Sequence, residues 1–412
     1  MIEMFPRRSR ALILDALSDT RIVLVMGARQ VGKSTLTQDI AATDHPARAL
    51  TLDDRTTREA ANNDPSGFVA GLDGPVLIDE VQRSPDLLLA IKEAVDNDRS
   101  PGRFLLTGSA NILTAPKIYE ALSGRIEIIT LSPLAQAEIE HAQTNLIDRL
   151  FAAAPPHIVG ATIGRDAFLD RAVHGGYPEA RLRAQRRRDR WFDSYLKTII
   201  DRDLRELSNA QKIGEMPSLL RLIAAQAANL YKAENIGNRM GLHKRTVQNY
   251  TQLLETVFLV RRIKAWRPSY GNREVQTPKI FVVDTGLLAH LLGADEQRVA
   301  EDDLVTGKLL ENFVAMEIAR LVDWAEAPVT QYHYRDRDDE VDVVLESRSG
   351  DIVCIECKAA ATLKSAAYRP MQKLRDSRGK EFVAGIVLYT GSDTKPLGDR
   401  LWAVPVSALW GG

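Results

Sequence analysis

A run with the composition of a phosphate-binding loop stands near the start of the chain. Gly27 to Ser34 reads GARQVGKS, which fits the pattern G-x-x-x-x-G-K-[ST] at every fixed position. The apolar run 21–26 before it predicts a strand, and the run 35–40 after it predicts the start of a helix. A glycine loop between a strand and a helix directs backbone N–H groups and the helix dipole at phosphate. We therefore expect a nucleoside triphosphate to bind these residues: Gly27, Ala28, Arg29, Gln30, Val31, Gly32, Lys33, Ser34 and Thr35.

Four side chains in two segments have types suited to phosphoryl chemistry. Lys33 is expected to reach the β- and γ-phosphates, and Ser34 to hold Mg²⁺. A later apolar strand ends in Asp79, and Glu80 follows at once. One carboxylate, Asp79, suits the metal and its water shell, and the other, Glu80, suits polarisation of the attacking water. The expected cofactors are ATP and Mg²⁺.

Polar side chains also follow the predicted strand 103–107. In a sheet that places this strand beside the P-loop strand, a polar residue here would touch the γ-phosphate, and the alternative is an ordinary polar turn. The candidates are Thr107, Ser109 and Asn111.

Arg125 directly precedes the predicted strand 126–131. An arginine there would lie at the edge of the nucleotide domain and could stabilise transition-state charge at a neighbouring subunit's γ-phosphate. The alternative is an exposed arginine that only aids solubility.

Strands and helical patterns alternate through this region, as expected for a parallel α/β sheet. At 412 residues the chain is expected to form two to four domains, and a formal net charge of −1 leaves nucleic-acid binding to local patches. We see no secretory signal and no membrane-length apolar run, which predicts a cytoplasmic protein with no membrane partner. The strand candidates are 21–26, 48–52, 75–79, 103–107 and 126–131.

Four segments in this order, GARQVGKST, LIDEVQRSP, RFLLTGSANIL and LSGRIEIITLSPL, resemble the AAA+ superfamily. More narrowly, the chain resembles a group of bacterial and archaeal ATPases with an uncharacterised C-terminal half. The resemblance implies that 1–135 is a P-loop ATPase core. It also implies a ring or other homo-oligomer, such as a hexamer, because an arginine finger, here Arg125, would act on the nucleotide of a neighbouring subunit. The implied roles are Walker A for Lys33 and Ser34, Walker B for Asp79 and Glu80, sensor for Ser109 or Thr107, and trans-acting finger for Arg125.

Residues 136–212 are mostly helical and polar, and are expected to form a helical lid. Six arginines lie within 181–190, opposed only by Asp189. Such a stretch can contact phosphates. Equally, it can be a solvated helix face paired with the downstream acids Asp201, Asp203 and Glu206.

Residues 213–298 are expected to form a winged helix. The segments 234–240 and 244–254 read as two helices joined by a glycine turn, with polar side chains on one face of the second helix. Two strands follow, and the stretch between them, 267–273, could form a basic wing. DNA contact is favoured over a protein-contact role. The expected DNA-binding residues are Lys244, Arg245, Gln248, Asn249 and Arg273.

In residues 299–412, two strands paired about Ser349 would place Asp342 opposite Glu356, with Lys358 on the same face. Glu311 lies on a helix upstream. Such a set can hold Mg²⁺ and activate a water against a phosphodiester. It resembles the PD-(D/E)XK restriction-endonuclease superfamily without the proline of its first motif. The alternative is a nuclease fold that no longer cuts; the acids favour surviving metal binding.

Two cysteines, Cys354 and Cys357, have the spacing of a redox pair. The apolar run around them favours a strand instead.

The predicted fold class is therefore α/β: a P-loop AAA+ parallel sheet with a helical lid, then a winged helix and an α+β restriction-endonuclease-like domain. The leading functional hypothesis is an ATPase that remodels or translocates DNA, duplex or branched. RuvB-type Holliday-junction motors and archaeal origin-recognition ATPases resemble this arrangement. The alternatives are an ATP-gated DNA nuclease in defence or repair, and a nucleotide-switched signalling protein.

Overall fold

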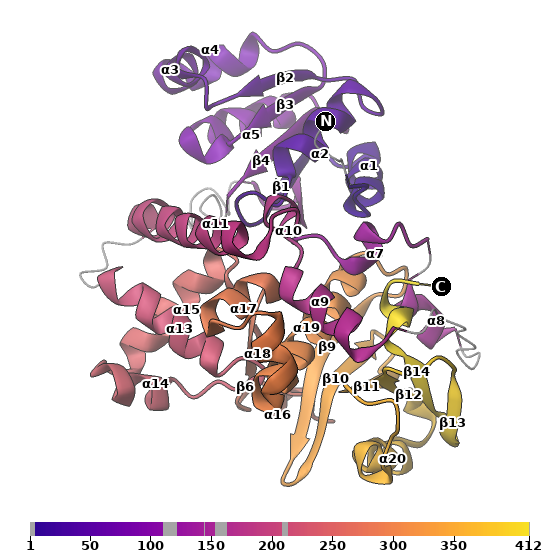
Figure 1. Ribbon diagram of the computed structural model, residues 1–412. Helices are drawn as coiled ribbons and strands as arrows, with labels where there is room; N and C mark the ends of the chain where they lie inside the picture. Colours follow the sequence, from indigo (N-terminus) through magenta and orange to yellow (C-terminus); the bar gives the residue numbers. More distant parts are fainter. Residues whose placement is uncertain (1–4, 110–121, 144, 153–162, 208–212, 412) are drawn as a thin grey trace.

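The computed structural model describes residues 5–109, 122–143, 145–152, 163–207 and 213–411. A parallel sheet occupies the upper part of the molecule in Figure 1, and two further sheets lie in the lower part. The long helix α11 (Gln185–Thr198) crosses between them. The molecule thus has two tiers joined by a helical layer.

The upper sheet is parallel throughout, with the strand order β2-β3-β4-β1-β5, which confirms the prediction of a parallel α/β sheet. β4 lies directly beside the P-loop strand β1, which meets the condition under which its polar residues would come close to the P-loop. The strands are β1 Ile22–Met26, β2 Arg48–Thr51, β3 Val76–Asp79, β4 Phe104–Gly108 and β5 Ile126–Thr130. The helices of this tier are α1 Ser9–Asp19, α2 Lys33–Ala42, α3 Arg55–Asn63, α4 Pro65–Ala70 and α5 Leu87–Asn97.

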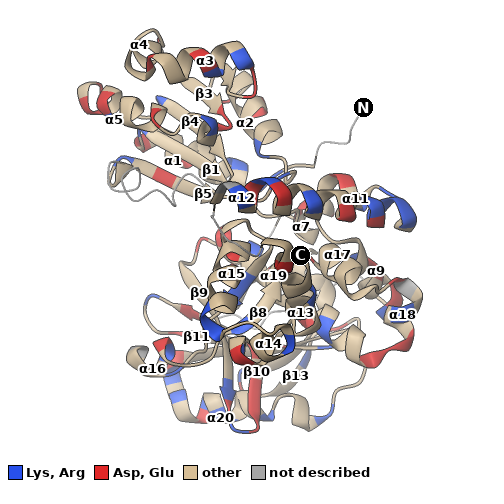
Figure 2. Ribbon diagram, turned by 90° about the vertical axis from the view of Figure 1, so that its left-hand side faces the viewer, with Lys and Arg blue, Asp and Glu red and all other residues tan. Residues whose placement is uncertain are grey.

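The helical segment after β5 includes the long helix between the tiers. α11 continues through a single π-helical turn, Ile199–Asp203, into α12 (Leu204–Leu207). Figure 2 shows basic residues gathered at one end of α11. Arg186, Arg187 and Arg190 are exposed there, whereas Arg188 is buried. The other helices are α7 Gln136–Ile139, α8 Leu146–Phe151, α9 Arg165–His174 and α10 Pro178–Arg181. Of these, α8 and α9 pack against the lower tier.

A small antiparallel sheet with the order β6-β8-β7 follows, accompanied by a helix-turn-helix. Gly241 ends the first helix of that pair at φ +64°, a conformation that glycine adopts without strain. The elements are α13 Met216–Ala225, β6 Asn229–Leu230, α14 Ala233–Met240, α15 Lys244–Thr256, β7 Val260–Ile263, α16 Tyr270–Glu274, β8 Lys279–Val282 and α17 Thr285–Leu292.

The last sheet is mixed, with the order β13-β14-β12-β11-β10-β9. The pairing of β10 with β11 matches Val343 to Ile355, which confirms the hairpin predicted about Ser349. Both cysteines lie on β11 as free thiols, as the strand interpretation predicted. The elements are α18 Glu296–Glu301, α19 Asp303–Asp323, β9 Val329–Asp336, β10 Asp339–Ser347, β11 Ile352–Lys358, α20 Arg369–Arg378, β12 Phe382–Tyr389, β13 Lys395–Gly398 and β14 Leu401–Pro405.

One apolar core runs through all of these segments, from Ile13 to Trp410. Trp410 packs on Phe168 of α9 and Phe313 of α19, with ring centroids 6.4 and 6.1 Å away. A second core fills the other face of the upper sheet. Among the helices of the described segments, none is long and apolar enough to cross a membrane.

Candidate active site

The P-loop leaves the carboxyl end of β1 and enters α2 at Lys33. Gly27 has φ +153°, and a Cβ there would lie 2.2 Å from the Leu131 carbonyl oxygen. Only glycine fits at this close approach between two backbone segments. The loop's glycine therefore serves packing as well as ligand approach.

Lys33 lies over its own loop. Its Nζ donates to the carbonyl oxygens of Gly27 (3.1 Å) and Ala28 (2.9 Å), and the residue is 5% exposed. Burial lowers the pKa of Lys33 below its ordinary value, and the Glu80 carboxylate opposes this effect. The ammonium group is thus held where a phosphate oxygen could replace the carbonyls as its partner.

Two oxygen donors suited to a hard cation lie side by side. Ser34 Oγ donates to Asp79 Oδ1 at 2.8 Å, and Asp79 is 7% exposed. Hydroxyl and carboxylate oxygens are ligands that Mg²⁺ accepts together with phosphate and water. These residues fit the metal that a nucleoside triphosphate would bring.

Glu80 lies just past β3 with φ +60°, an uncommon conformation for a residue other than glycine. Gln82 Nε2 donates to Glu80 Oε2. Sequence reasoning assigned no role to Gln82, although it stands two positions after the acid. Backbone strain and this amide together fix the direction of the Glu80 carboxylate.

The two described polar candidates at the end of β4 differ in their contacts. Thr107 Oγ1 donates to Asp79 Oδ1 and accepts from the backbone N–H of Glu80 at 3.1 Å. Ser109 meets this group through its backbone N–H, which donates to Gln82 Oε1 at 3.3 Å. Asn111 lies outside the described residues. Of the two described candidates, Thr107 has the side chain that touches the acidic pair.

The side chain of Arg29 joins the P-loop to the helical layer. Its Nε and Nη2 donate to the two carboxylate oxygens of Asp203, at 2.6 and 2.7 Å. Tyr195 Oη of α11 also reaches the Arg29 carbonyl oxygen at 3.5 Å. Sequence reasoning offered Asp203 as a partner of the basic stretch 181–190, and this pairing is wrong. Nothing local in the sequence signals a contact over 174 positions.

Arg125 lies at the amino end of β5, and the P-loop lies at the carboxyl end of its parallel neighbour β1. A five-residue strand separates these edges by about 16 Å. The guanidinium is held by Asp96, with Nε 2.5 Å and Nη2 3.2 Å from its oxygens. The hydrogen bond from Arg125 lowers the pKa of Asp96 to about 2. Arg125 therefore points away from the nucleotide site of its own chain.

The second helix of the helix-turn-helix, α15, has the two faces that its sequence predicts. Val247, Tyr250 and Leu254 are buried. His243 caps the helix, its Nδ1 accepting from the Arg245 N–H at 3.2 Å. The polar side chains on the other face are all exposed: Lys244, Arg245, Gln248, Asn249 and Gln252.

The expected basic wing is wrong. The stretch between β7 and β8 contains the short helix α16, and Arg273 on it is 4% exposed. Its Nη1 and Nη2 contact Glu346 of β10 at 2.5 and 2.8 Å. Arg267 Nη2 likewise donates to the Arg335 carbonyl oxygen at 2.7 Å. These arginines fasten the stretch to the C-terminal sheet, so Arg273 is not available to DNA phosphate.

The C-terminal set Glu311, Asp342, Glu356 and Lys358 does come together. Lys358 Nζ lies 2.6 Å from Glu356 Oε1, and the Asp342 N–H donates to Glu356 Oε2 at 3.2 Å. Burial, and then the Asp342 charge, raise the pKa values of Glu311 and Glu356. The sequence missed a fifth member, Lys279 of β8, which contacts Glu311.

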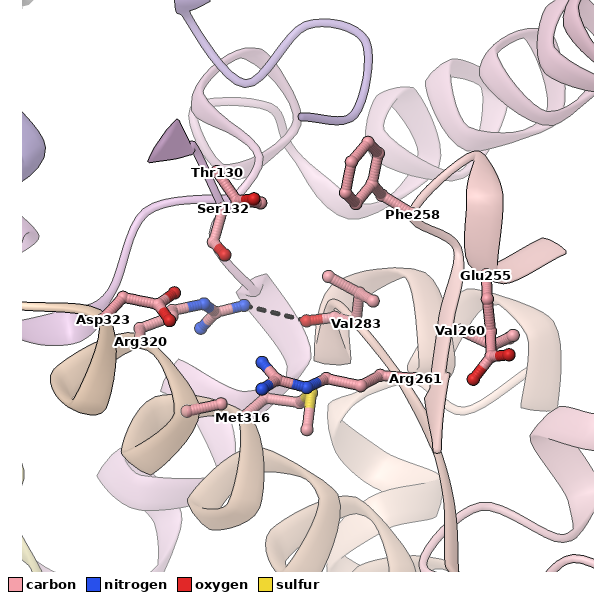
Figure 3. Close-up of a pocket in the computed structure, with 11 residues that line it drawn as sticks. Thr130, Ser132, Glu255, Phe258, Val260, Arg261, Val283, Met316, Arg320 and Asp323 are labelled. Carbon is pink, nitrogen blue, oxygen red and sulfur yellow. Dashed lines mark hydrogen bonds between the residues drawn. The ribbon is translucent and has the colours of Figure 1, made fainter. Parts of the chain in front are cut away.

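A cavity of about 290 Å³ lies where the two tiers meet (Figure 3). Thr130 and Ser132 reach it from the end of β5, Arg261 from β7 and Arg320 from α19. Arg320 Nη2 donates to the Val283 carbonyl oxygen at 2.9 Å. The carboxyl end of β5 in the upper sheet thus faces the small antiparallel sheet, through β7, and the helix α19.

Three family models match parts of the chain. Residues 19–140 match a model described as an AAA domain. Residues 165–298 and 306–409 match two models described as domains of unknown function, DUF8612 and DUF4143.

Similar proteins come from several bacteria. Uncharacterized proteins of Mycobacterium bovis and Mycobacterium tuberculosis are each 29% identical over 406 residues, covering 98% of this chain and 84% of theirs. An uncharacterized protein of Haemophilus influenzae is 23% identical, over 59% of this chain and 57% of its own.

Solved structures with partial similarity include a Walker-type ATPase of Pyrococcus abyssi, with a TM-score of 0.44 and 14% identity over 70% of this chain and 96% of that one. A RuvB structure of Thermotoga maritima has a TM-score of 0.28 and 17% identity, over 62% of this chain and 87% of that one.

Proposed function

We propose that this chain, whose residues 19–140 form a P-loop ATPase domain of the AAA type, couples ATP hydrolysis to DNA held by its helix-turn-helix. The proposal joins three parts: a hydrolytic site, a second subunit that completes it, and a DNA-contacting helix.

In the hydrolytic site each residue has a separate task. Lys33 would exchange its loop carbonyls for the β- and γ-phosphates, and Ser34 and Asp79 would hold Mg²⁺. The bound metal would neutralise charge on the phosphates. Glu80, aimed by Gln82, takes a hydrogen bond from the attacking water. Thr107 keeps the two acids in fixed relation.

A second subunit is required if Arg125 acts on phosphate, because its own P-loop lies at the opposite sheet edge. A guanidinium supplied by a neighbour stabilises the charge that develops on the transferred phosphoryl group. We therefore include a homo-oligomer, a ring, in the proposal.

The observation that carries the DNA part is the exposed polar face of α15. Its opposite face is buried in the core, so the helix is rigidly presented. Two cations for phosphates and two amides for base edges stand together on it, the residue types that read DNA in a major groove. They are Lys244, Arg245, Gln248 and Asn249.

The test measures ATP turnover with single-stranded, duplex and four-way junction DNA. We expect stimulation by at least one of these forms. Glu80→Gln should lower turnover by about a hundredfold or more while ATP binding is retained. Turnover that is equal on all substrates and without DNA would contradict the coupling while leaving the ATPase intact.

A matched pair of variants locates the DNA contact. Lys244→Ala/Arg245→Ala and Arg186→Ala/Arg187→Ala each remove two exposed positive charges, the first from α15 and the second from α11. We expect only the first to weaken DNA binding and to lower the slope of log K against log salt by about 2. The reverse result would move the contact to α11.

A further inference from the structure

Lys279 is a buried cation that joins the small antiparallel sheet to the C-terminal segment by ion pairs. It opens β8 of the small antiparallel sheet and is 1% exposed. Its Nζ lies 2.5 Å from Glu311 Oε1 on α19 and 2.6 Å from Glu340 Oε1 on β10. A lysine so deeply buried is stable as a cation only where carboxylates surround it.

The remaining carboxylates of this cluster also have internal donors. Asp342 Oδ2 accepts from the Cys357 N–H at 3.0 Å. Glu356 accepts from the Asp342 N–H on one oxygen and from Lys358 on the other. Arg335 adds a further positive charge 3.5 Å from Glu340. Each acid is thus already neutralised or hydrogen-bonded from within the chain.

The arrangement does not fit the divalent cation that a PD-(D/E)XK-like site implies. Within the described ranges, no three Asp, Glu, His or Cys side chains are placed to hold a metal ion. Mg²⁺ needs oxygen ligands at about 2.0–2.1 Å in a near-octahedral set. An ammonium group between two of the acids takes lone pairs that such a set would use.

The strand that bears Lys279 is fastened to α19 by its backbone. Asn312 of α19 bonds both backbone groups of Val282, accepting from its N–H at 2.9 Å and donating to its carbonyl oxygen at 2.8 Å. These two bonds fasten β8 to the helix that bears Glu311. β8, which bears Lys279, and α19, which bears Glu311, are therefore held side by side.

We propose that Lys279 is the built-in counter-ion of the acidic cluster Glu311, Glu340, Asp342 and Glu356, and that it keeps divalent cations out. The C-terminal segment then does not cut DNA by a metal-dependent route. The cluster instead joins the helix-turn-helix segment to the C-terminal sheet. This goes beyond the proposed coupling of ATP to DNA, which needs no cutting.

The test titrates Mn²⁺ alone into the full chain without nucleotide and follows bound metal by electron paramagnetic resonance. The single variant Asp342→Asn should bind Mn²⁺ as the wild type does. Lys279→Met keeps the side chain's length without its charge, and should create a site that binds Mn²⁺ at least roughly tenfold tighter. Adding Asp342→Asn to Lys279→Met should remove that site.

Lys308→Met is the matched control, because it removes a partly buried lysine elsewhere, on α19, which donates to the Ala225 carbonyl oxygen at 2.7 Å. It should create no Mn²⁺ site. A folded Lys279→Met protein without the new site would overturn the proposal, and so would wild-type binding that Asp342→Asn abolishes. If Lys279→Met does not fold, the comparison of wild type with Asp342→Asn decides alone.

Discussion

At the scale of single residues, the polar groups of the two candidate sites are held by partners that the chain itself supplies. Glu80 is directed by Gln82, Asp79 by Thr107, and Lys279 by two glutamates. His333 on β9 is one of several buried side chains with incomplete pairing. Its Nε2 lies 3.3 Å from the Thr277 carbonyl oxygen, but its Nδ1 has no hydrogen-bond partner among the described residues. This incomplete pairing has a consequence for pH.

His333 should make the protein less stable as pH falls below about 6.5. Burial, with the nearby Lys279 charge, lowers the pKa of His333 to about 4 in the folded protein. The unfolded chain protonates near 6.5, so it binds more protons between these values. Stability from His333 is full above 6.5 and falls by at most about 1.4 kcal/mol per pH unit down to 4.

Urea unfolding of the wild type and His333→Gln at several pH values checks this. The difference between the two free energies of unfolding should shrink as pH falls through that window, because glutamine does not titrate there. Glu340 and Arg267 also face the ring, and they are the same in both proteins. If the difference in the free energy of unfolding does not depend on pH, the pKa of His333 is the same in the folded and unfolded protein, and the prediction is wrong.

At the scale of elements, one contact joins the P-loop to the π-helical turn that follows α11. The Arg29–Asp203 pair is bidentate and its side chains are 21% and 10% exposed. It links the loop that holds phosphate to the helical layer beneath it. Any shift of α11 must therefore be felt at the loop, or break the pair.

A double-mutant cycle should measure this link. Arg29→Ala, Asp203→Ala and the double variant should give a coupling of roughly 1–2 kcal/mol in denaturant unfolding, since partly buried neighbours couple. The exposed pair Arg55–Glu59, 82% and 56% exposed, is the control and should couple close to zero. Equal coupling in the two cycles would mean that the Arg29–Asp203 contact contributes nothing special.

Elements with strong local patterns were predictable from the sequence. All five strands of the parallel sheet, both helices of the helix-turn-helix and the register about Ser349 follow from apolar runs and glycine turns. The errors concern partners far along the chain. Arg273 finds Glu346 over 73 positions and Lys279 finds Glu311 over 32, and no local periodicity encodes such pairs.

The same limit applies within the candidate site. Gly27, Lys33, Ser34 and Asp79 could be predicted as site residues because motif spacing specifies them. Gln82 has no fixed place in such a pattern, and it became visible only through its bond to Glu80.

At the scale of the whole molecule, the position of Arg125 predicts that two damaged subunits can restore each other. Lys33→Ala should be inactive for lack of phosphate binding, and Arg125→Ala for lack of the finger. Mixed, an intact P-loop can meet an intact finger, so turnover should return to a measurable fraction of wild type. The ATPase rate of the mixture at several ratios checks this.

A mixture that stays as inactive as its components would contradict a trans role for Arg125. Asp96→Asn is a useful companion, because it removes the negative charge that holds Arg125 within its own chain. It should leave turnover in the oligomer intact if a neighbour's phosphate is the working partner.

The continuous core has a consequence for how the chain is made. Trp410 packs against Phe168 and Phe313, in the same core that contains Ile13. During translation, the body can close only after Trp410 has left the ribosome, however early the P-loop emerges. Nascent chains would expose apolar surface until then, and ribosome-bound chaperones should bind that surface.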